Sequence, residues 1–115
     1  MEFLFYSVEL DKKNKRTAFL IREIENRFSK SSNYYRIIIK GVWPEPFESE
    51  TTKPGFYTSY DVVAENIDQA FELIKRFEPE YVRDSLKIEE TEILEENHND
   101  PIGIYSANSY SFFTE

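Results

Sequence analysis

The sequence contains no cysteine, only one histidine and only three glycines in 115 residues. Without cysteine there is no disulfide framework, no thiolate metal site and no thiol nucleophile. Three glycines are too few for phosphate-binding loops, and neither a P-loop nor a GxGxxG pattern is present. His98 lies in a polar stretch, and no serine stands in a GxSxG pattern, which argues against Ser-His-Asp catalysis. We therefore expect a protein that is not an enzyme and carries no cofactor.

Long apolar segments are also missing. No run approaches the roughly 20 apolar residues that cross a bilayer, and the first residues, MEFLFYSVEL, lack the basic region and cleavage site of a signal peptide. We therefore expect a soluble, cytoplasmic protein that does not contact membranes. What the chain has in quantity is aromatic residues (ten Phe, eight Tyr and one Trp), and disordered chains are poor in these. Its length fits one folded domain over residues 1–115.

The charge of the chain is unevenly distributed. Residues 1–40 carry nine Lys/Arg and five Asp/Glu, a balance of +4, whereas residues 41–115 carry five Lys/Arg and 17 Asp/Glu, a balance of -12. The total is -8, so phosphate would be repelled and nucleic acid is disfavoured as a partner. A basic protein partner is favoured, because opposite charges speed association. Plain solubility is the alternative explanation.

Strands are predicted where apolar residues alternate or β-branched residues cluster. Glycine within the second strand, at Gly41, marks either a bulge or a close approach of the backbone. A long loop with three prolines, from Pro44 to Gly55, follows that strand. The predicted strands cover residues 3–10, 34–43, 56–64 and 86–94, and a weaker fifth strand or extended tail covers 104–113.

Two helices are predicted between these strands. Thr17 can cap a helix over residues 18–28, where Leu20, Ile21, Ile24 and Phe28 form one apolar stripe. Asn66 and Gln69 resemble a capping box, and an apolar i, i+3, i+4, i+7 spacing continues to a helix end near Phe77. The resulting order, β-α-β-β-α-β with a C-terminal extension, predicts a ferredoxin-like α+β two-layer sandwich.

The stretch IEETEILEENHND, residues 88–100, places five carboxylates before His98 and a sixth after it. These are ligand types for a divalent metal, but the spacing fits neither an EF-hand loop nor an HExxH helix. On a strand, Glu90 and Glu92 would share one face while Glu89 points the other way with Thr91. Such charges fit a solvated surface, an edge strand protected from aggregation or a protein-binding face.

The segments GFYTSYDVVAENIDQAFELIKRF, residues 55–77, and SYSFFTE at the C-terminus resemble parts of small acidic bacterial proteins. In size, acidity and aromatic content the whole chain resembles immunity proteins that accompany polymorphic toxins. The resemblance implies binding and blocking of a cognate toxin, often a basic nuclease, inside the producing cell. No motif accompanies it, so it assigns no residue a role.

A protein-binding surface is therefore the leading hypothesis, because aromatic anchors beside acids are typical of selective interfaces. Its residues would be Glu89, Glu90, Glu92, Glu95 and Glu96 together with Trp43, Phe47 or Tyr57. The mechanism would be occlusion of a basic active site. The alternatives are a self-associating domain, in which residues 104–113 pair or exchange between two copies, and a small metal-dependent enzyme.

Overall fold

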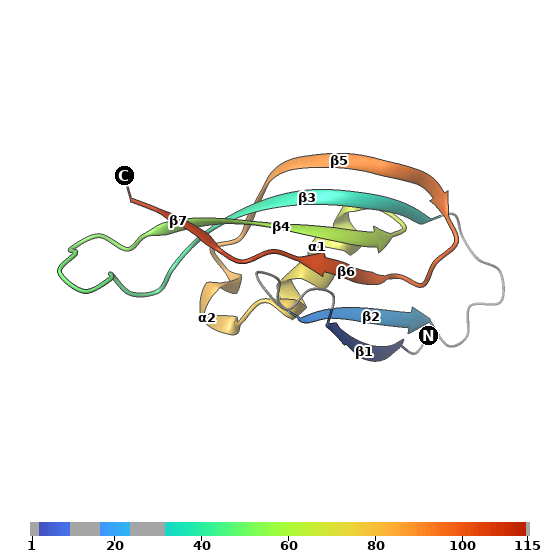
Figure 1. Ribbon diagram of the computed structural model, residues 1–115, viewed down its shortest axis with the longest axis horizontal. Helices are drawn as coiled ribbons and strands as arrows, with labels where there is room; N and C mark the ends of the chain where they lie inside the picture. The colour runs from blue at the N-terminus through green and yellow to red at the C-terminus, as the bar shows by residue number, and fades with distance from the viewer. Residues whose placement is uncertain (1–2, 10–16, 24–31, 115) are drawn as a thin grey trace.

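The computed structural model describes residues 3–9, 17–23 and 32–114. In these residues seven strands form one antiparallel sheet, in the order β1-β2-β6-β4-β3-β5, with β7 paired to β4. Figure 1 shows this order from bottom to top, with α1 behind the middle of the sheet. The elements are β1 (Phe3–Glu9), β2 (Thr17–Glu23), β3 (Ser32–Val42), β4 (Gly55–Ala64), α1 (Ile67–Phe77), α2 (Glu80–Arg83), β5 (Lys87–His98), β6 (Gly103–Ala107) and β7 (Ser111–Phe113).

The predicted ferredoxin-like sandwich is wrong, because the first of its two helices does not form. Thr17–Glu23 is strand β2, which pairs with β1 in an unbroken register from Phe3↔Glu23 to Glu9↔Thr17. The TAFLIRE sequence carries an apolar stripe at helical spacing, but its threonine, phenylalanine and isoleucine also favour a strand. Pairing with the neighbouring strand β1 then selects the strand over the helix, because helix propensity is a weak preference that tertiary context overrides. The rest of the predicted helix, residues 24–28, lies outside the described residues.

The remaining predicted elements are largely confirmed. Strands occur at β1, β3, β4 and β5, although β5 extends four residues beyond its predicted end, into the stretch expected to turn. The predicted fifth strand is divided in two, and its first part, β6, lies inside the sheet between β2 and β4. None of the helices among the described residues is long and apolar enough to cross a membrane.

Helix α1 begins as its sequence predicts. The backbone N–H of Gln69 donates to Oδ1 of Asn66 at 2.8 Å, so Asn66 is the N-cap. The side chain of Gln69 reaches back one residue further than a capping box requires, because its Oε1 accepts from the N–H of Glu65 at 2.7 Å. The helix ends at Phe77, and Pro79 follows its C-cap residue.

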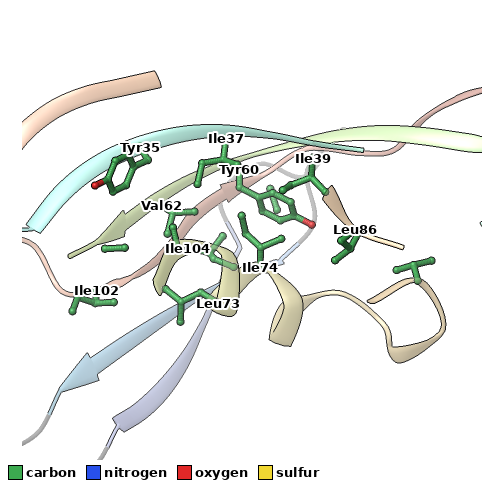
Figure 2. Close-up of a cluster of buried hydrophobic side chains, with 14 of the residues drawn as sticks. Tyr35, Ile37, Ile39, Tyr60, Val62, Leu73, Ile74, Leu86, Ile102 and Ile104 are labelled. Atoms are coloured by element: carbon green, nitrogen blue, oxygen red, sulfur yellow. The ribbon is translucent and has the colours of Figure 1, made fainter. Parts of the chain in front are cut away.

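The core lies between one face of the sheet and the two helices. Figure 2 shows Ile37, Tyr60 and Ile104, from three adjacent strands, directed toward Leu73 and Ile74 of α1. Alternation along β3 buries one set of side chains and leaves Arg36, Ile38, Lys40 and Val42 on the other face. The face away from the helices is therefore the open face, and it carries most of the charged groups of β3 and β5.

Two glycines allow aromatic rings to lie directly on the sheet. A Cβ atom added to Gly41 would lie 2.3 Å from Cζ of Phe56, and one added to Gly55 would lie 2.3 Å from Cζ of Phe113. Neither glycine has a positive φ, so space and not backbone conformation requires them. The register of β3 with β4 is unbroken at Gly41, which confirms the close approach and excludes the bulge.

Candidate functional site

The acidic stretch forms an edge of the sheet. Within the described residues β5 pairs only with β3, and all five of its predicted contact glutamates are exposed, as are Ile93 and Leu94. Glu90 lies opposite Ile38 and Glu92 opposite Arg36, so the two share one face, as predicted, and this is the open face. The register shifts between Ile38 and Ile39, which leaves Glu89 as an extra residue. It lines a groove together with Lys40 and Val42, whose side chains lie on the open face.

Arg36, on the open face of β3, lies opposite Glu92. Arg36 forms a two-pronged ion pair with Asp61 of β4, with Nε at 3.0 Å from Oδ1 and Nη2 at 3.3 Å from Oδ2. The hydrogen bond and charge of Asp61 raise the pKa of Arg36, and Glu92 adds to this effect. Asp61 lies within the otherwise largely apolar sequence of β4. Its carboxylate is paired with the guanidinium group of Arg36 on the open face.

The second feature is an aromatic cluster at one end of the sheet, on the helix-bearing side. Its centre is Trp43, whose ring centroid lies 5.4 Å from that of Phe112 and 5.6 Å from those of Tyr81 and Tyr110, all at edge-to-face angles. Phe47 lies 5.0 Å from Phe112. We call this group the aromatic cluster, and its members are Trp43, Phe47, Phe56, Tyr81, Tyr110 and Phe112.

Three of the six rings of the aromatic cluster are largely exposed to solvent. Phe47 and Phe112 are each 41% exposed and Tyr81 is 59% exposed, whereas Phe56 is fully buried beneath them. Edge-to-face contacts favour this arrangement by about 0.5–1.5 kcal/mol for each ring pair. The cluster is thus anchored in the core at Phe56 and presents three large apolar rings to the outside.

The long loop after β3 supports the cluster. The N–H of Trp43 donates to the carbonyl of Pro54 at 2.9 Å and closes the base of the loop. At its tip the N–H of Glu50 donates to the carbonyl of Phe47 at 2.9 Å, and Ser49 has a φ of 71°. A positive φ at the third position of a four-residue turn is the arrangement that glycine or asparagine prefers. This turn sets the position of Phe47.

A buried carboxylate holds the cluster from below. Glu78, 1% exposed, accepts hydrogen bonds from the hydroxyl groups of Tyr60 and Tyr110, the latter at 2.7 Å to Oε1. Its carbonyl accepts from Nη2 of Arg83 at 3.0 Å, which ties the end of α1 to α2. Tyr110 also contacts Trp43 and Phe56, so Glu78 fixes the ring on which the exposed part of the cluster rests.

The structure separates the residues that the sequence grouped into one surface. Trp43 and Phe47 belong to the aromatic cluster, but Tyr57 lies on the open face, stacked on Phe113 with centroids 4.9 Å apart. Glu92 lies opposite Arg36, six residues before Val42. At about 3.3 Å per residue, this places it roughly 20 Å along the sheet from the cluster. The acids and the aromatic anchors are therefore two areas and not one.

Sequence reasoning missed several residues of the cluster. Tyr110 and Phe112 stand in an aromatic C-terminal segment, which indicates packing but not its contact with Trp43. Tyr81 and Glu78 carry no sequence signal, because only the turn between α1 and α2 brings them to this end.

Metal chemistry finds no support in the part of the chain that the structure describes. Those residues hold no group of three or more His, Cys, Asp or Glu side chains arranged to bind an ion. The side chain of His98 lies outside the description.

Comparison with protein families, with curated protein sequences and with solved structures finds no match to this chain. Geometry and charge alone therefore support a function.

Proposed function

We propose that this chain is a protein-binding domain that holds a basic partner at the aromatic cluster. The observation that carries the proposal is the joint exposure of Phe47, Tyr81 and Phe112 around Trp43. Contiguous apolar patches on a protein surface mark interaction sites, and aromatic anchors supply most of the binding energy at interfaces. The rings are held from below, so they lose little conformational freedom on binding.

The charge around the cluster favours a basic partner. The loop that carries Phe47 also carries Glu45, Glu48 and Glu50, all of them exposed. Glu80 and Asp84, also exposed, flank Tyr81 on the other side. The five exposed glutamates of β5 extend the negative field along the sheet, where they would steer a cation-rich partner before contact.

An immunity-type inhibitor is the most specific form of this proposal. The chain would neutralise a basic cognate toxin in the cytoplasm of the producing cell by covering the toxin's active site. An interface of standard size uses about 800 Å² on each partner. We place that area at the aromatic cluster alone, because Glu90 and Glu92 of β5 lie on the opposite face and would act on the partner only through their field. Binding, not catalysis, would be the whole activity.

Charge disfavours a second copy of the chain as the occupant of the cluster. A two-fold interface centred there would bring the acids of one copy against the same acids of the other. Of the two modes considered from the sequence, pairing of two copies edge to edge through β6 is disfavoured, since β6 is already paired on both sides within its own sheet. A mass measurement in solution separates the two cases: we expect a monomer.

The test starts with capture of partners from the source organism's lysate at low and high salt, followed by binding measurements on the purified partner. We expect one basic protein, bound stoichiometrically and faster at low salt. The variant F47A/F112A should weaken binding by about 2 kcal/mol or more, roughly 30-fold, if these rings are anchors.

Two matched variants control this test. I93A removes an exposed apolar side chain of β5 far from the cluster and should leave affinity within about twofold. The triple reversal of Glu90, Glu92 and Glu96 to lysine should mainly slow association. Wild-type affinity in F47A/F112A would refute the aromatic surface, and an acidic captured partner would refute the charge argument.

A further inference from the structure

A groove of about 530 Å³ opens on the open face, where the end of β3, the start of β5 and β7 meet. This volume is within the range of sites for small molecules. The residues that matter for its chemistry are Lys40, Lys53, Lys87, Glu89, Val42 and Phe113.

The three lysines of this groove are unusual in so acidic a chain. Residues 41–115 carry only five Lys/Arg against 17 Asp/Glu, yet two of those five reach the groove and Lys40 is a third cation there. On other parts of the surface, Arg36 is paired with Asp61 and Lys75 with Glu72. Across the described residues no carboxylate lies within 4.0 Å of any of the three groove ammonium groups. Among the described residues Glu89 is the only acid in the lining, which gives the groove a local charge of +2.

One of the lysines is positioned by aromatic rings. The ammonium group of Lys40 lies 5.4 Å from the ring centroid of Phe113 and 6.0 Å from that of Tyr57. These two rings are stacked, and Phe113 lies directly over Gly55. Cation–π attraction holds a lysine in such a place and reduces its freedom. The groove thus combines a fixed cation, two further cations and an aromatic wall.

We propose that this groove binds an organic phosphate. A phosphate monoester carries close to two negative charges at neutral pH and would balance the +2 of the lining. Lysine ammonium groups bind phosphate as point charges and need no fixed plane of approach. Phe113 and Val42 offer an apolar wall for the organic part of the ligand. This site lies on the opposite face from the aromatic cluster and does not depend on the proposed protein partner.

Titration of the protein with phenyl phosphate and with inorganic phosphate, followed by amide NMR shifts, tests the proposal. Sodium chloride at matched ionic strength is the reference. We expect saturable shifts at Gly41 and Gly55, which both line the groove, with phenyl phosphate at least threefold tighter than inorganic phosphate. Shifts that sodium chloride reproduces would overturn the site. Equal affinity for the two phosphates would overturn the assignment to an organic phosphate.

A pair of double variants locates the binding. K53Q/K87Q should lower the affinity for phenyl phosphate at least tenfold, because it removes two of the three cations. The control K75Q/R76Q makes the same change of charge on α1 and should leave the affinity within twofold. Equal losses in the two double variants would show general charge attraction and overturn the proposal. Unchanged affinity in K53Q/K87Q would do the same.

Discussion

Replacement of Gly41 by alanine tests the packing of the sheet against its aromatic residues. The added Cβ would lie 2.3 Å, 2.7 Å and 3.0 Å from three atoms of the Phe56 ring. That ring is fully buried and in contact with Trp43 and Tyr110, so it cannot move without disturbing the aromatic cluster. Overpacking of this kind costs about 1–3 kcal/mol. About 0.5–1 kcal/mol of this cost is offset, because alanine restricts the unfolded chain and suits a strand better than glycine does.

A contact of 2.3 Å against a fully buried ring belongs to the upper part of the overpacking range, about 2–3 kcal/mol. The expected net loss is therefore about 1–2.5 kcal/mol, which lowers the melting temperature of a domain this size by about 4–10 °C. Urea unfolding followed by Trp43 fluorescence and by circular dichroism measures it, and the two signals should coincide. The matched control is G55A, whose Cβ meets the ring of Phe113 at the same 2.3 Å. Phe113 is only half-buried, so its ring can shift toward solvent and the loss should be smaller. Wild-type stability in G41A, or equal losses in both variants, would refute this reasoning.

Three further substitutions test other parts of the structure. E78A removes the acceptor of the Tyr60 and Tyr110 hydroxyl groups and should lower the free energy of unfolding in urea by about 3 kcal/mol or more. Y110F removes only one of these hydrogen bonds and should lower it by about 1–2 kcal/mol. A loss under about 1 kcal/mol in E78A would contradict this. N66A removes the N-cap of α1 and should cost about 1 kcal/mol, with N66D as the control that retains the cap. S49G should stabilise the protein by up to about 1 kcal/mol, because relief of the positive φ, about 1–2 kcal/mol, exceeds the cost of a freer unfolded chain, about 0.4–1 kcal/mol. Clear destabilisation would contradict the turn geometry.

The accuracy of the sequence-based fold prediction depends on how local each signal is. Helix α1 was predicted correctly, because the Asn66 cap, the apolar spacing and Pro79 all lie within fifteen residues. The segment that became β2 carries two compatible local patterns, and only its pairing with β1 and β6 selects between them. No local pattern records such pairing, and losing one helix was enough to make the predicted fold wrong.

The same limit applies to the candidate site. Trp43 and Phe47 were grouped because the loop that carries Phe47 begins directly after Trp43, and the structure keeps both in the aromatic cluster. Their separation from the glutamates of β5 follows from the length and direction of β3, which a residue pattern does not give. The bulge at Glu89 is equally invisible in sequence, because it is defined by the register with the neighbouring strand.

The place of β6 in the sheet has a consequence for the order in which the protein is made. β6 joins the N-terminal hairpin to the rest of the sheet, yet Gly103, its first residue, is synthesised 83 residues after its partner Leu20. At about 5–20 residues per second, the ribosome needs roughly 4–17 s to make this segment. During that time the hairpin has no described neighbour to join. The strands of the sheet therefore cannot be joined in the order of synthesis, and the hairpin is connected to the rest of the sheet only after β6 has left the ribosome.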